Sequence, residues 1–180
     1  MFKKLTAQDI TRISLFTALI CISSYIKIDL PAVPVTAQTL AIMLAGSILN
    51  TRQAALSVLV YLLLGSVGAP VFSGGNAGLY IILGRFGGYL IGFLLGAIVI
   101  SLMKGRKNNL VQMIFANIIG GIVVIDLFGA LWFSAMTGMN LVQAFVVGAL
   151  YFIPTDLIKA VIAALLAQRV NKVLAHNHTN

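Results

Sequence analysis

Leu110 to Ala135 read LVQMIFANIIGGIVVIDLFGALWFSA, an apolar run whose single charged residue is Asp126. A helix needs about 20 mostly apolar residues to cross the hydrocarbon core of a bilayer, and this run is long enough. The rest of the chain has the same character, because 60% of its 180 residues are hydrophobic and 9% are charged. Soluble domains carry roughly 25% charged residues. A surface so poor in charge cannot face water on all sides, so lipid must surround most of it.

Five other apolar runs accompany this one, at about Ile10–Ile26, Thr36–Leu49, Ala54–Val67, Leu79–Met103 and Val142–Leu174. The second and third runs are short for a full span. The first has the length of a signal-peptide core, but no small-residue cleavage motif ends it, so we interpret it as a retained helix. The sequence thus predicts an all-α integral membrane protein, in which residues 1–180 form a single domain of six transmembrane helices.

The basic residues predict how these helices are oriented. The chain has twelve Lys and Arg against four Asp and Glu, a net charge of +8. Such a balance can indicate nucleic-acid binding, but here the basic residues lie between apolar runs and form no stripe on a polar face. With a cytoplasmic N-terminus, one basic residue, Lys27, falls in an outer connection, and nine fall inside: Lys3, Lys4, Arg12, Arg52, Lys104, Arg106, Lys107, Arg169 and Lys172. This positive-inside pattern predicts a multi-pass protein with both termini in the cytoplasm and no nucleic-acid partner.

Residues that could perform catalysis or bind a metal are scarce. The chain has no glutamate and a single cysteine, Cys21, inside an apolar run, while His176 and His178 lie in the polar C-terminal tail. Neither a metal-ligand cluster nor a set of Ser, His and Asp can be assembled from these residues. We therefore expect no metal site, no bound cofactor and no enzyme. The alternative, an intramembrane enzyme, would have to use Asp156 or Lys159, or else Arg85.

Ionisable residues inside membrane spans are costly and usually mark function. Asp156 and Lys159 are three residues apart in the last run, so a helix places them on the same side. Pro154 precedes them and is expected to kink that helix and help shape a cavity. Arg169 marks the inner boundary and follows Asp156 by thirteen residues, about 20 Å of helix, which places Asp156 in the outer half of the membrane. Counting in the same way from Lys104 places Arg85 near the outer end of its own run. The charges therefore predict a site in the outer half of the membrane, unless Asp156 and Lys159 form a purely structural ion pair.

Two other features have an ordinary and a functional interpretation. Asp126 is either a packed acid, a residue at the outer membrane interface, or part of a site. The predicted outer loop Val71–Gly78 reads VFSGGNAG, and its glycines allow a ligand to approach the backbone closely. The Asn76 amide could donate and accept hydrogen bonds, and Phe72 and Tyr80 could cover an apolar ring. The alternative is a plain turn, since no phosphate-loop motif follows.

Small residues recur at four-residue spacing in two of the runs. Gly84, Gly88, Gly92 and Gly96 would form one line along the fourth helix, where a neighbouring helix can approach closely. Tight packing within the monomer is the first interpretation, and a contact with another subunit is the second. Ser14 and Ala18 form a shorter stripe on the first helix, which indicates little by itself.

Several short motifs follow one another along the chain: Val33–Leu40 (VPVTAQTL), Leu44–Gly46 (LAG), Tyr61–Gly65 (YLLLG), Gly68–Asn76 (GAPVFSGGN), Gly87–Phe93 (GGYLIGF) and Phe152–Ala160 (FIPTDLIKA). In order and spacing, nearly the whole chain resembles BioY, the biotin-binding substrate-specificity subunit (S-component) of energy-coupling factor (ECF) transporters. The resemblance implies an S-component-like helix bundle with a biotin pocket near the outer face, closed by the first and third loops.

The same resemblance implies that Asn76, Asp156 and Lys159 contact biotin. Further candidate contacts are Arg85, Tyr89, Phe72, Tyr80 and Gln38. The chain departs from the family pattern at Gly84-Arg85-Phe86, where relatives usually have Gly-Pro-Ser or Gly-Pro-Thr, at Leu90, where some have a binding arginine, and at Thr155, where glycine is common. Arg85 is either a substitute cation for the biotin carboxylate or an anchor at the membrane interface.

Partners also follow from the resemblance. Family members couple to a transmembrane subunit and two ATP-binding subunits in the cell membrane of prokaryotes, and a small-residue stripe on the first helix, here Ser14 and Ala18, is the associated contact. No ATP-binding motif occurs in this chain, so the partners would use the ATP. Three other functions stay open: a capture subunit for another small vitamin-like solute, an intramembrane enzyme, and an assembly protein whose buried charges only pair.

The charge pattern generates a prediction about topology. In a variant whose native Cys21 is replaced by alanine, we expect a cysteine at position 172 or 106 to be shielded from a membrane-impermeant maleimide in intact cells and to be labelled after lysis. Labelling of either position from outside would contradict the predicted orientation.

Overall fold

The computed structural model describes residues 4–28, 35–105, 108–150 and 152–176, and their secondary-structure elements are helices apart from a pair of short strands. Proline residues 31 and 34 and the basic residues at 3, 106 and 107, on which some predictions rely, lie outside the described residues. The elements are α1 (Ala7–Ser23), β1 (Lys27–Ile28), β2 (Val35–Thr36), α2 (Gln38–Ile48), α3 (Thr51–Ser66), the 3₁₀ turn η1 (Ser73–Gly75), α4 (Leu79–Leu83), α5 (Gly87–Met103), α6 (Leu110–Ile118), the π-helical η2 (Ile119–Val124), α7 (Ile125–Thr137), α8 (Leu141–Phe145), the π-helical η3 (Val146–Leu150) and α9 (Ile153–His176). Each of the six predicted segments is therefore helical.

Two of the predicted helices are interrupted, and these are corrections to the sequence-based boundaries. The predicted helix Leu79–Met103 is broken between α4 and α5, where Gly84 adopts an extended conformation (φ −79°, ψ −177°). The indole nitrogen of Trp132 donates to the Gly84 carbonyl at 2.9 Å and so satisfies an acceptor that the break leaves outside the helix. The predicted helix Val142–Leu174 is also divided, and its two parts, Leu141–Gly148 and Ile153–Leu174, are bent by 56°.

Pro154 explains where the second part begins. It lies in the first turn of α9 and not in a helix interior, so the hydrogen bond that proline cannot donate is not needed there. Pro154 therefore starts a helix instead of kinking one. By length and composition, one described helix, Leu110–Thr137, can cross a membrane unaided, and the bent pair would be a second; Gln38–Ile48 and Gly87–Met103 are apolar but shorter.

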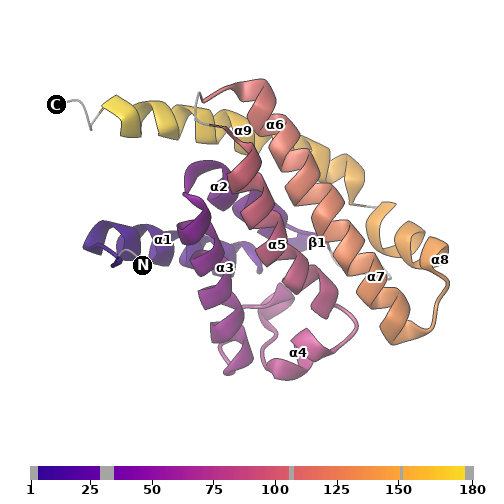
Figure 1. Ribbon diagram of the computed structural model, residues 1–180. Helices are drawn as coiled ribbons and strands as arrows, with labels where there is room; N and C mark the ends of the chain where they lie inside the picture. The colour runs from indigo at the N-terminus through magenta and orange to yellow at the C-terminus, as the bar shows by residue number, and fades with distance from the viewer. Residues whose placement is uncertain (1–3, 29–34, 106–107, 151, 177–180) are drawn as a thin grey trace.

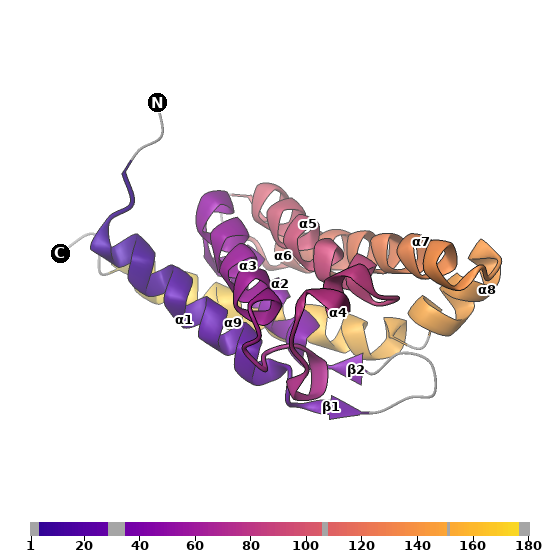
Figure 2. The same cartoon turned by 90° about the horizontal axis from the view of Figure 1, so that it is seen from below.

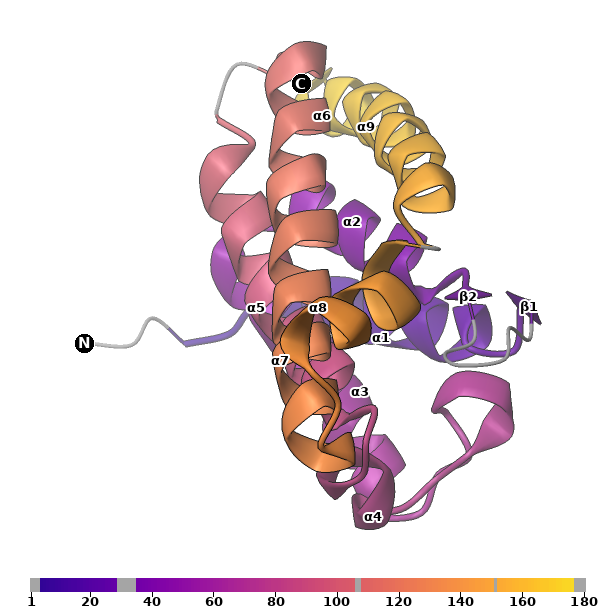
Figure 3. The same ribbon diagram turned by 90° about the vertical axis from the view of Figure 1, so that its right-hand side faces the viewer.

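Helix α5 is the centre of the bundle (Figure 1). It packs against α7 and η2 on one side and against α2 and α3 on the other, while α9 packs on α2 and α6, and α1 packs on α3. Viewed from a second direction, α6, η2 and α7 form one continuous long helix, and α8 folds back beside its end (Figure 3).

Glycines bring α5 and the long helix together. An added Cβ at Gly88 would lie 2.2 Å from the Cβ of Trp132, one at Gly92 would lie 3.1 Å from the Cα of Ile125, and one at Gly96 would lie 2.5 Å from the Gly120 oxygen. The stripe thus packs within the monomer, which confirms the first interpretation for these three glycines. Gly84 is not part of the stripe, because the break separates it from α5.

The two ends of the bundle differ in character. The start of α1 and the end of α9 lie on the same side of the molecule (Figure 1). Polar contacts join other elements at that end: the Asn108 amide donates to the Gln168 carbonyl at 3.0 Å, and the Lys104 ammonium donates to the Leu49 carbonyl. The strand pair lies at the opposite end of α1, close to the η1–α4 connection (Figure 2).

The glycine packing generates a prediction about stability. Gly88→Leu should lower the thermal unfolding temperature of the detergent-purified protein, because overpacking of a tight contact typically costs about 1–3 kcal/mol. Ala18→Leu is the matched control, since Ala18 is exposed on α1 and a leucine there meets no packed neighbour. Equal unfolding temperatures for Gly88→Leu and the control would show that the α5–α7 contact is not close-packed.

Candidate functional site

A cavity of about 320 Å³ lies among α2, α5, α7 and α9, beneath the strand pair and the loop that follows α3. That volume is at the lower end of the range for small-molecule sites. Its lining combines aromatic and aliphatic side chains with a few polar ones: Lys27, Val35, Thr36, Gln38, Thr39, Phe72, Ser73, Asn76, Ile81, Phe86, Tyr89, Leu90, Phe93, Ile125, Asp126, Phe152, Asp156 and Lys159.

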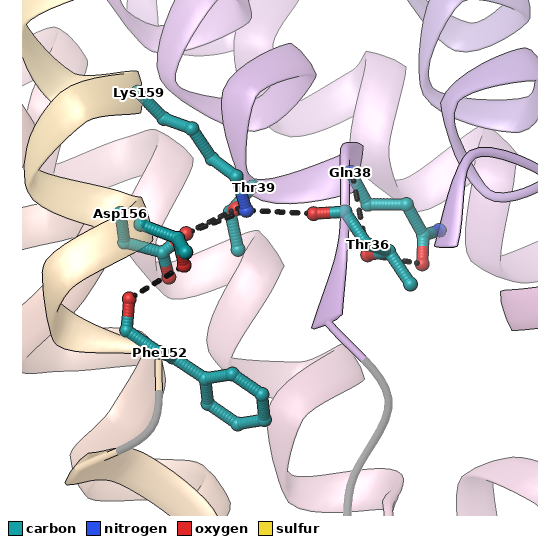
Figure 4. A network of polar contacts seen from close by, with 7 residues as sticks. Thr36, Gln38, Thr39, Phe152, Asp156 and Lys159 are labelled. Carbon is teal, nitrogen blue, oxygen red and sulfur yellow. Dashed lines mark hydrogen bonds and ion pairs between the residues drawn. The ribbon is translucent and has the colours of Figure 1, made fainter. Parts of the chain in front are cut away.

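A buried ion pair lies at one wall of this cavity (Figure 4). The Lys159 ammonium is 2.7 Å from Oδ1 of Asp156, and the Asp156 side chain is only 3% exposed. Both residues are on the first two turns of α9, three positions apart, so they project from the same side of the helix as predicted. A buried pair is held stably only when further hydrogen bonds satisfy the remaining donors and acceptors.

Helix α2 and the strand before it supply those hydrogen bonds. Lys159 also donates to the Thr36 carbonyl at 2.7 Å and to Oγ1 of Thr39 at 3.0 Å, and Thr39 in turn donates to Oδ1 of Asp156 at 2.9 Å. An ammonium group has three donors, so all three of those on Lys159 have an acceptor. The network therefore fastens the start of α9 to the start of α2 (Figure 4).

The strand pair extends this network to the first loop. Lys27 on β1 pairs with Thr36 on β2, whose carbonyl accepts from Lys159. Gln38 is almost fully buried, and its amide nitrogen donates to the Tyr61 hydroxyl at 2.6 Å, which joins α2 to α3. The backbone of β1 and the Lys27 side chain are thus held over the mouth of the cavity.

The loop after α3 closes another side of the cavity. Phe72 is 1% exposed and packs edge-on against Tyr61, with ring centroids 5.5 Å apart. Gly65 makes room for it, because a Cβ there would lie 2.2 Å from the Phe72 ring. Gly74 has φ +71°, a conformation that favours glycine, and its nitrogen donates to the Ser24 carbonyl at 3.0 Å. The Asn76 amide donates to the Ser73 carbonyl at 2.6 Å, so its oxygen is left for other donors.

The apolar wall comes mainly from α5 and the start of α9. The Tyr89 hydroxyl donates to the Gly148 carbonyl at 2.7 Å, and its ring meets Phe152 edge-on at 6.2 Å. Phe86 adds a further ring and stacks on Phe133 at 6.3 Å. These contacts fix aromatic faces along the cavity beside the polar network.

The structure brings together most of the residues singled out from the sequence. Six of them line the cavity: Asn76, Asp156, Lys159, Tyr89, Phe72 and Gln38. Two others do not. Arg85 is exposed at the α4–α5 break with its guanidinium carbon 4.7 Å from the Phe86 ring centroid, and Tyr80 is 67% exposed on α4. The depth predicted for Arg85 assumed one straight helix over Leu79–Met103, and the break at Gly84 removes that assumption.

Other lining residues were missed by the sequence analysis. Lys27, Thr36, Thr39, Phe86 and Phe152 all line the cavity, and Asp126, which had no assigned role, lies among them. For Lys27 a signal existed, since it is the single basic residue in a predicted outer connection. The threonines carried no signal, because short polar side chains near a helix start usually act as caps. Ser14 and Ala18 are both exposed on α1, far from this cavity in sequence and outside its lining.

Comparison with known proteins shows which family this chain resembles over nearly its whole length. The BioY family model matches residues 1–176. A protein of Rhizobium etli named biotin transporter BioY is 39% identical over 177 residues, which cover 92% of this chain and 94% of the relative. A probable biotin transporter BioY of Bacillus subtilis is 37% identical over 176 residues, covering 95% and 94%.

A solved structure has the same fold. The crystal structure of the S-component for biotin from an ECF-type ABC transporter superposes with a TM-score of 0.84 at 29% identity, covering 94% of this chain and 95% of that one. With a family model that matches nearly its whole length and relatives of this similarity, the chain belongs to the BioY family.

Proposed function

We propose that this protein is the biotin-binding S-component of an ECF-type transporter, which captures biotin at the outer face of the membrane. The observation that carries the proposal is the ion pair between the buried Asp156 and the half-buried Lys159, which lies in the wall of an otherwise largely apolar cavity. Biotin matches that combination, since it joins a polar bicyclic urea to an apolar chain that ends in a carboxylate.

The urea has two N–H donors and one carbonyl acceptor. Oδ1 of Asp156 already accepts from Thr39 and Lys159, so the other oxygen of Asp156 is the acceptor for a ligand N–H. The urea carbonyl accepts from the Asn76 amide or, in a reversed pose, from Lys159. Phe72, Tyr89 and Phe152 then cover the ring system and the valerate chain. The urea is thereby recognised by a rigid set of partners, which lowers the cost of ordering them on binding.

The biotin carboxylate needs a cation, and three basic residues are candidates. Lys159 lies beside Asp156 in the polar network, where the urea is placed. Arg85 stands outside the cavity against Phe86. Lys27 lines the cavity at its mouth, on a strand whose register is fixed by pairing with Thr36. We therefore assign the carboxylate to Lys27, so that the urea lies deep and the acid lies near the opening.

Delivery to the cytoplasm requires partners with an energy source. We propose that a transmembrane subunit and two ATP-binding subunits supply it, and that they dock on α1. Ser14 and Ala18 are one helical turn apart and both exposed, which leaves a shallow face where another helix can approach.

A prediction about Asp156 follows from the proposed contacts. Asp156→Asn should weaken biotin binding on the order of 30-fold or more, because truncating a buried charged hydrogen-bond partner costs about 2–5 kcal/mol and each 1.4 kcal/mol is tenfold. The measurement is equilibrium binding of radiolabelled biotin to the detergent-purified protein. Asp9→Asn, which removes a carboxylate from the start of α1, is the control and should bind normally. Native affinity in Asp156→Asn would overturn the site assignment.

A second prediction separates the candidate cations. Lys27→Gln should weaken binding of free biotin by up to about fivefold, and it should leave the already weaker binding of carboxylate-amidated biotin nearly unchanged, since that ligand has no charge to pair with Lys27. Arg85→Gln should affect both ligands little. If Arg85→Gln weakens binding of free biotin but not of amidated biotin, and Lys27→Gln weakens neither, then Arg85 is the partner of the carboxylate.

A further inference from the structure

Asp126 is a buried acid in the cavity lining that no interaction of the network includes. Its residue exposure is 4%, and it is the first acidic side chain on α7. Among the described residues, no side chain or backbone group donates a hydrogen bond to its carboxyl, and its Oδ2 is fully buried without a partner. Asp156, by contrast, accepts two hydrogen bonds on one oxygen. The cavity thus contains one acid that is hydrogen-bonded to the protein through one oxygen and one acid that is not hydrogen-bonded to it.

The surrounding packing keeps Asp126 facing the cavity. The π-helical turn Ile119–Val124 ends two residues before it, and such turns often occur near functional sites. On one side, Ile125 is pressed against Gly92 of α5; on the other, Gly129 leaves space for the Tyr89 ring, which a Cβ would approach to 2.1 Å. With both flanks fixed on α5, rotation of α7 cannot carry the carboxyl away from the cavity.

A buried carboxyl without a partner is costly. Burying a polar group without a hydrogen bond disfavours the folded state, and the cost is larger for a charge. An apolar residue of similar size would pack at this position without that cost. Asp156 and Lys159 line the same cavity, but neither makes a hydrogen bond with Asp126. A donor from a bound ligand is the partner that this position lacks.

We propose that Asp126 is a second urea-binding acid and accepts a hydrogen bond from one ureido N–H of biotin, while Asp156 accepts from the other. This assignment rests on the proposed function and deepens it. The two ureido N–H groups lie on opposite sides of the carbonyl, so one carboxylate oxygen of Asp156 cannot serve both. Two acceptors on different walls of the cavity, one on α7 and one on α9, can each accept from one of them. Asp126 would then help to distinguish a urea from a ring that lacks two donors.

The first test measures binding and stability together. Asp126→Asn should weaken biotin binding about tenfold or more in the detergent-purified protein. Without biotin, its thermal unfolding temperature should equal or exceed that of the native protein, because the buried carboxyl oxygen makes no hydrogen bond whose loss would destabilise the fold. Asp9→Asn is the matched control for loss of an acid elsewhere. Undiminished biotin binding in Asp126→Asn, or reduced binding that accompanies a lower unfolding temperature without biotin, would overturn the assignment.

The second test identifies the contact itself. Biotin methylated at one ureido nitrogen, and its isomer methylated at the other, should both bind weakly to the native protein. Asp126→Ala should bind one isomer at least about tenfold better than the native protein does, because the methyl group fills the space of the carboxyl, and it should bind biotin worse. If Asp126→Ala weakens the binding of biotin and of both methylated isomers to the same extent, the proposed contact between Asp126 and a ureido N–H is wrong. If native protein binds no biotin at all, the proposed function fails, whereas tight native binding with these negative results removes Asp126 alone.

Discussion

The ammonium group of Lys159 has acceptors from three parts of the chain: the Asp156 carboxylate on α9, the Thr39 hydroxyl on α2 and the Thr36 carbonyl on β2. Loss of the Asp156 carboxylate would leave the ammonium charge uncompensated, and loss of either neutral acceptor would leave one of its donors without a partner in the protein. The positions of α9, α2 and the first loop are therefore coupled through one side chain. Because β1 is paired to Thr36, the same interaction also places Lys27 at the mouth of the cavity. The polar floor and the opening of the site are built from one network.

The second constraint is the close approach of α5 to the long helix formed by α6, η2 and α7. Gly88, Gly92 and Gly96 allow it, and Gly129 admits the Tyr89 ring from the other side. This contact sets the aromatic wall on α5 opposite α9 and holds Asp126 beside it. A rigid apolar wall and a fixed polar network leave little to be ordered when a small ligand binds, which favours affinity for a ligand of the matching shape.

Much of this arrangement was predictable from the sequence, because its main features depend on patterns of few residue types. The scarcity of charge indicated lipid, the spacing of the apolar runs gave the helical segments, and the i, i+3 relation of Asp156 and Lys159 placed them together. The resemblance to a known family then directed attention to Asn76. These features are local, or they depend on spacing alone, so tertiary contacts change them little.

The residues that were misplaced depend on backbone geometry that local sequence does not determine. The run Leu79–Met103 is apolar throughout, yet it breaks at Gly84, because Trp132, from a distant helix, satisfies the carbonyl exposed there. Arg85 is consequently turned away from the cavity. Lys27 enters the site through a strand pairing with Thr36, and neither short strand has a periodic pattern. Titration calorimetry of the detergent-purified native protein with biotin measures directly whether this cavity recognises the urea ring. We expect saturable binding of one biotin per chain and no binding of a biotin analogue that lacks the urea ring. If biotin gives no binding heat and is not retained by the protein, biotin is not the ligand of this site.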